Sequence, residues 1–131
     1  MACFLVPTAE ALVISAVNKA QSAKEKKQET GAEAAKADKI PFSRKLRWLT
    51  NLLWGGSFLL AFEHVWHGEV VPFFPFLTAA SNPEDASEML HEMATAGVGM
   101  AVAVTIVWLL MLAGAAVIEK RAAKAEVKEG A

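Results

Sequence analysis

The sequence predicts an all-α fold: an integral membrane bundle of three transmembrane helices, with the N-terminus outside and the C-terminus cytoplasmic. Hydrophobic residues make up 54% of the 131, and the mean hydropathy of +0.32 exceeds that of most soluble domains this size. Apolar runs at 46–66 and 93–118 are each long enough to cross a bilayer, which takes about 20 helical residues. Because every Lys and Arg falls within 19–47 or from 120 onward, those segments are expected inside the cell.

Residues 1–18 are predicted to form the first transmembrane helix. The run is short for a crossing and carries Glu10 near its middle. An ionisable group at that depth is costly and usually faces the bundle interior with a partner. Residues 19–45 interleave Ala, Lys, Glu and Gln, which is typical of a charged cytoplasmic connection with a solvated helical face. Contact with anionic lipid headgroups is the alternative.

Residues 46–67 are predicted to form the second transmembrane helix. Thr50, Ser57 and His64 recur every seven positions and therefore lie on one side of a helix. We expect this polar stripe to face away from lipid.

The segment 68–82 is apolar but too rich in proline to span a membrane. Its Phe and Pro residues favour a cover that lies in the outer interface or folds over the bundle. At its end, Asn82 and Pro83 are an N-cap and a first-turn proline, so a helix is predicted to begin there.

That helix, 83–119, is predicted to start on the outer side and to continue inward as the third transmembrane helix. Thr95 lies near one polar side of it. The remaining residues, 120–131, are rich in Lys and Glu and are expected to form a cytoplasmic tail.

Glycines in both long runs are expected to permit close helix packing, or in the second helix the approach of a flat ligand: Gly55, Gly56, Gly97 and Gly99. Three short helices bury little surface, so we expect copies of the chain to associate, or a larger membrane complex to complete the structure. Membrane lipid is the other expected partner. The localisation predicted is the inner (cell) membrane, multi-pass.

All three histidines lie close to the predicted outer face, together with several acids. Imidazole and carboxylate together suit zinc, iron or manganese, and residues three or four apart share a helix face. We therefore predict a divalent or transition metal site that serves transport, sensing or redox chemistry. Its candidate ligands are His64, His67, His91, Glu63, Glu88 and Glu92.

Two alternatives are open at this point. A haem could be held between His91 and either His64 or His67, which would make the chain an electron-transfer subunit. The second alternative is a structural or assembly subunit without cofactor. Polar residues also gather at membrane boundaries because they are in contact with water there. No nucleophile motif or phosphate-binding loop is present, so an enzyme is the less favoured reading. The near-neutral charge argues against nucleic acid as a partner.

Overall fold

The structure is a computed structural model that describes residues 2–29 and 40–130, so the middle of the predicted cytoplasmic connection lies outside the described residues. The described part is all-α, as predicted, and contains no strand. Its elements are α1 (Leu5–Glu29), α2 (Phe42–Trp66), the 3₁₀ turn η1 (Thr78–Ser81), α3 (Pro83–Glu92), the π-helical turn η2 (Met93–Gly97) and α4 (Val98–Glu129).

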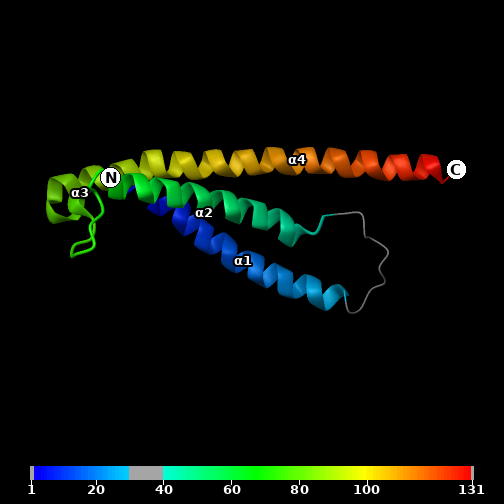
Figure 1. Cartoon of the computed structure of the whole chain (residues 1–131), viewed down its shortest axis with the longest axis horizontal. Helices are drawn as coiled ribbons and strands as arrows, with labels where there is room; N and C mark the ends of the chain where they lie inside the picture. Colours follow the sequence, from blue (N-terminus) through cyan, green and yellow to red (C-terminus); the bar gives the residue numbers. More distant parts are fainter. Residues whose placement is uncertain (1, 30–39, 131) are drawn as a thin grey trace.

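The three long helices lie alongside one another and leave α3 at one end (Figure 1). α1 and α2 run antiparallel and pack together over most of their length, and α4 packs against both. The N-terminus and α3 share one end of the molecule, while α4 extends beyond its neighbours at the other (Figure 1). The end of α2 therefore meets the start of α1.

The core between the helices is made of a few buried apolar side chains. Ala11 of α1 packs with Leu49 and Leu53 of α2 and with Trp108 of α4. The indole Nε1–H of Trp108 donates a 2.7 Å hydrogen bond to the backbone oxygen of Lys45, which satisfies the polar atom of this buried ring. These contacts fix the rotation of α4 about its own axis relative to α2.

Two carboxylates from other helices hold the N-terminus of α2. Glu25 accepts a 3.1 Å hydrogen bond from the backbone N–H of Ser43. Glu119 accepts one of 3.1 Å from the N–H of Ile40 and pairs with Lys45 at 3.3 Å. Negative charge at a helix N-terminus complements the helix dipole and the unpaired N–H groups there.

At the opposite end, the Phe/Pro segment folds into a small hairpin. An isolated bridge joins Val70 to Leu77, and α3 then begins at Pro83. Asn82 accepts a 3.2 Å hydrogen bond from the N–H of Glu84, so it caps α3 as the sequence predicts. Ala79 and Met89 are buried at this end of the molecule and form a second small apolar cluster with Ala2.

Within residues 2–29 and 40–130, one helical stretch, Pro83–Glu129, is long and apolar enough to cross a membrane. The three predicted crossings are therefore supported only in part. The first half of α2 contains the polar residues Arg44, Arg47 and Asn51. The apolar part of α1 ends at Asn18. These polar residues lower the hydropathy of the two helices.

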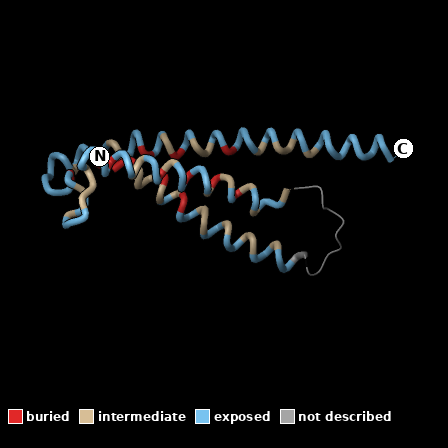
Figure 2. The backbone as a smooth tube through the Cα atoms, viewed as in Figure 1, coloured by how far each residue is buried: buried red, intermediate tan, exposed pale blue. Residues whose placement is uncertain are grey.

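Burial is confined to the sides on which the helices face one another, and the outward sides are exposed (Figure 2). Large apolar side chains stand on those outward sides of α2 and α4. They include Phe58 and Leu59 of α2 and Leu110 and Ile118 of α4.

Candidate functional site

The candidate site is built around His64, which lies in the last turn of α2. Its side chain is buried, with a residue exposure of 7%. The ring Nδ1–H donates a 2.6 Å hydrogen bond to the backbone oxygen of Leu60, one turn earlier. A carbonyl oxygen can only accept, so this bond places a hydrogen on Nδ1 and leaves Nε2 with a lone pair in the neutral ring. Nε2 is therefore the atom offered to a ligand.

Two groups from other segments meet that Nε2 atom. The sulfur of Cys3, just before α1, lies 3.5 Å from it, and Oε2 of Glu69, in the hairpin, lies 3.6 Å from it. The ring of Phe4 packs edge-on against the imidazole, with ring centroids 5.2 Å apart. Three separate parts of the chain thus converge on one imidazole.

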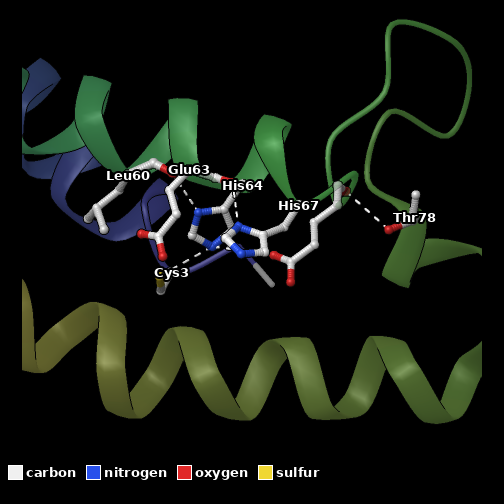
Figure 3. Close-up of polar contacts among 7 residues, drawn as sticks. Cys3, Leu60, Glu63, His64, His67 and Thr78 are labelled. Carbon is white, nitrogen blue, oxygen red and sulfur yellow. Dashed lines mark hydrogen bonds and ion pairs between the residues drawn. The ribbon is translucent and has the colours of Figure 1, made fainter.

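His67 repeats the arrangement one turn further along. Its Nδ1–H donates a 2.9 Å hydrogen bond to the backbone oxygen of Glu63, so its Nε2 is also left available. The ring is exposed, unlike that of His64. Figure 3 shows both imidazoles leaving the same side of α2, toward the start of α1.

These side chains line a pocket of about 340 Å³ at this end of the bundle. Its walls come from the N-terminus, α2, the hairpin and α4. They are formed by Cys3, Leu60, Glu63, His64, His67, Glu69 and Met100.

Gly97 allows the N-terminus to come close enough to form this pocket. A Cβ atom built on Gly97 would lie 2.8 Å from Cγ2 of Val6 and 2.9 Å from the backbone oxygen of Cys3. Real Cβ atoms do not approach other atoms so closely. The missing side chain therefore lets α1 pass against the π-helical turn, the kind of irregularity often found at functional sites.

The predicted ligands divide into two groups. His64, His67 and Glu63 share the pocket wall. Glu88, His91 and Glu92 lie on α3 instead and are not part of that wall. In the described residues, no three His, Cys, Asp or Glu side chains are positioned to hold a metal ion together. The complete six-residue ligand set and the haem alternative stay predictions, and neither gains a direct observation.

Four residues of the pocket wall are not among the ligands predicted from the sequence: Cys3, Leu60, Glu69 and Met100. A single cysteine near the N-terminus has no sequence motif that indicates a ligand. The predicted topology did indicate that Cys3 could lie near the histidines, because it puts the N-terminus on the same side of the membrane as the end of the second helix. The sequence gives no comparable indication for Met100, because a methionine in an apolar helix is usually a packing residue.

The predicted polar residues of the transmembrane segments have different partners. Glu10 accepts a 2.8 Å hydrogen bond from the hydroxyl of Thr105 in α4. Thr50 and Thr95 bond the carbonyl of the residue four positions earlier in their own helices. The Ser57 hydroxyl is buried and has no hydrogen-bond partner among the described residues.

The predicted packing glycines also differ. Only Gly97, of the four, lies against another helix within residues 2–29 and 40–130. A Cβ on Gly55, Gly56 or Gly99 would meet no atom within 4 Å in that part of the chain. Their proposed role in packing therefore depends on contacts outside this chain.

Comparison with protein-family models, with curated proteins and with solved structures gives no match for this chain. Functional inference therefore rests on the chemistry of the pocket.

Proposed function

We propose that the protein is a multi-pass protein of the inner membrane that holds a metal ion in the pocket between His64 and Cys3, at the outer face. In this proposal α1 and α2 cross the membrane beside α4, with the N-terminus outside and the C-terminus in the cytoplasm. The bound ion serves transport, sensing or electron transfer, and the chain is a binding subunit rather than an enzyme.

The distribution of apolar and basic side chains supports the membrane part of the proposal. Phe58 and Leu59 of α2 are 73% and 70% exposed, which is unfavourable in water but not in lipid. In the part of the chain that the structure describes, α1 and α2 lie against the one helical stretch that is long and apolar enough to span. The segment 48–118 contains no Lys or Arg, and the bases on either side of it suit the cytoplasm.

One observation carries the metal part of the proposal: two neighbouring imidazoles each bond a backbone carbonyl through Nδ1. Metal-binding histidines almost always use one ring nitrogen in this way, which fixes the tautomer and aims the other nitrogen at the ion. His64 and His67 share this pattern and one pocket.

The separations around His64 also suit coordination. Zn²⁺ binds thiolate sulfur at about 2.3 Å and imidazole nitrogen at about 2.0–2.1 Å, so two such ligands in a tetrahedral site lie about 3.5 Å apart. The Cys3 sulfur lies 3.5 Å and the Glu69 oxygen 3.6 Å from Nε2 of His64. No three of the described His, Cys, Asp or Glu side chains already form a complete site, so metal binding in this proposal requires a further ligand to move toward Nε2 of His64.

The test is metal retention by the purified full-length chain in detergent, measured by dialysis against Zn²⁺ and elemental analysis. Wild type is expected to retain one ion per chain, and His64→Gln to retain about 10- to 100-fold less at limiting metal. His91→Gln is the matched control, because His91 lies outside the pocket wall, and it should retain the ion. Metal-free wild type would refute the proposal and favour a structural or assembly subunit. Equal losses in both variants would instead favour the ligand set that includes His91.

A further inference from the structure

We infer that a second pocket, between the second half of α1 and the start of α2, binds the phosphate of an anionic phospholipid whose acyl chains lie along the same two helices. This pocket has a volume of about 460 Å³ and lies toward the end of the bundle away from α3 (Figure 1). The inference rests on the proposed crossing of α1 and α2 and does not depend on the proposed metal site.

Three cations from two helices line this pocket. α1 contributes Lys19 and Lys26, and α2 contributes Arg47. The other wall residues are small or polar: Ser15, Asn18, Ser22 and Ala23. Among the described residues, the wall therefore has three positive charges and no carboxylate. Ammonium and guanidinium groups are the side chains that bind phosphate oxygens most strongly, and hydroxyl groups add further donors.

The charges of Lys19 and Arg47 are available to a ligand. Neither side chain forms an ion pair within residues 2–29 and 40–130, and both residues are exposed. Lys45 differs, because its ammonium group pairs with Glu119 at 3.3 Å. Cations that no acid of the protein neutralises attract anions, and basic pockets between membrane helices on the cytoplasmic side bind anionic lipid headgroups in this way.

The pocket lies at the depth expected for lipid phosphates. The rise of α2 from Arg47 to Trp66 is about 30 Å at about 1.5 Å per residue, which equals the thickness of the hydrocarbon core of a bilayer. Arg47 is the last cation before the apolar part of α2, and Lys19 is the first cation after the apolar part of α1. Both cations therefore lie at the cytoplasmic boundary of the proposed crossing.

The two helices become apolar on the membrane side of the pocket. Leu12 lies seven residues before Lys19 on one side of α1, and Trp54 lies seven residues after Arg47 on one side of α2. Both apolar side chains are exposed, and the indole N–H of Trp54 donates a 3.2 Å hydrogen bond to the hydroxyl of Ser15 in the pocket wall. Cations followed by apolar surface match the headgroup and acyl chains of a phospholipid, whereas a soluble phosphate ester would use the cations alone.

Native mass spectrometry of the full-length chain in detergent tests the site by counting the lipids retained from an equal mixture of phosphatidylglycerol and phosphatidylcholine. Wild type should retain one phosphatidylglycerol and prefer it by about 10-fold or more. Lys19→Gln together with Arg47→Gln should weaken phosphatidylglycerol binding about 30-fold, at about 5-fold for each cation. The matched control, Lys24→Gln together with Arg44→Gln, removes the same charge from the same helices outside the pocket wall and should bind as wild type does.

The outcomes separate this site from other sources of binding. Equal losses in the two double variants would show a general attraction of positive charge for anionic lipid and would overturn the inference. Glycerol phosphate that binds wild type as tightly as phosphatidylglycerol does would assign the pocket to a soluble anion and would also overturn it.

Zn²⁺ retention by the same samples distinguishes this inference from the proposed metal site. Both double variants should retain Zn²⁺ as wild type does, because the cations lie outside the pocket that His64 lines. Loss of lipid preference with Zn²⁺ retained would overturn the lipid site alone, and lipid retained without Zn²⁺ would overturn the metal site alone. Circular dichroism shows whether each variant has folded, and Lys19→Gln alone, with an expected loss of about 5-fold, replaces a misfolded double variant.

Discussion

The hydroxyl of Thr105 in α4 donates a 2.8 Å hydrogen bond to the carboxylate of Glu10 in α1, across 95 residues of sequence. The same hydroxyl also lies 2.8 Å from the backbone oxygen of Ala101, one turn earlier. A carboxyl group in the middle of a membrane helix is costly unless it is turned inward and bonded. This contact therefore links α1 to α4 and gives Glu10 a partner inside the bundle.

Replacing Thr105 by Val should destabilise the bundle by about 1 kcal/mol, because Glu10 then loses the hydrogen bond from α4 while the side-chain shape is kept. The free energy of unfolding in mixed detergent micelles measures this loss. Thr95→Val is the matched control, since the Thr95 hydroxyl bonds the carbonyl of His91 in its own helical segment. Equal effects of the two substitutions would contradict a specific role for the contact between α1 and α4.

Replacing Gly97 by Ala should destabilise the protein by about 1–3 kcal/mol, because the new methyl group would overlap the side chain of Val6 and the backbone oxygen of Cys3. A backbone oxygen cannot rotate away as a side chain can, so α1 must shift. The shift should also widen the 3.5 Å contact between Cys3 and His64 and weaken metal binding. Thermal unfolding in detergent measures the first effect.

Gly99→Ala serves as the control for that substitution. Its Cβ would meet no atom within 4 Å among the described residues, and alanine is the better helix former by about 1 kcal/mol. Unchanged or slightly raised stability is expected. A loss equal to that of Gly97→Ala would mean that the approach of α1 to η2 is not tight at Gly97.

The crossing of α1 can be tested by labelling single cysteines in a Cys3→Ser background with a membrane-impermeant maleimide on intact cells. Asn82→Cys, at the hairpin end, should be labelled, and Ala20→Cys, in the second half of α1 just past the predicted span, should be protected until the cells are opened. Both positions are exposed on the protein surface, so the membrane alone decides the result. Labelling of Ala20→Cys from outside would show that α1 does not cross and that α4 is the sole span among these helices.

The hairpin is expected to lie in the outer membrane interface. Phe73 and Phe74 are 66% and 86% exposed, and aromatic side chains favour that depth. A spin label on Phe74→Cys, again with Cys3→Ser, should collide more often with oxygen than with a water-soluble nickel chelate in bilayers. A label on Ser81→Cys, an exposed polar position, should do the reverse. Equal collision patterns would place the Phe/Pro segment in water.

The sequence predicted what periodicity and capping control. The all-α class is confirmed for the described residues, and α3 begins at Pro83 behind its Asn82 cap, because both depend on local interactions. His64 and His67 were also identified by position, as the end of a long apolar run. The three-span arrangement is supported only in part, because one helical stretch among the described residues is apolar enough to cross a membrane. Polar and charged residues lower the mean hydropathy of α1 and α2.

The composition of the pocket could not be predicted in the same way. Cys3 reaches His64 only because Gly97 admits the N-terminus beside the π-helical turn, and that turn leaves no simple sequence pattern. Glu69 reaches the same imidazole because Gly68 adopts a positive φ of 73° and starts the hairpin there. Both are three-dimensional consequences of a backbone irregularity.

X-ray absorption at the edge of the ion that the purified protein retains tests the central claim most directly, because it reports the atoms bound to the metal. The account predicts sulfur at about 2.3 Å together with the scattering pattern of imidazole at about 2.0 Å, and loss of the short sulfur distance in Cys3→Ser. A shell of oxygen neighbours alone, unchanged in Cys3→Ser and in His64→Gln, would contradict a metal site between these two residues.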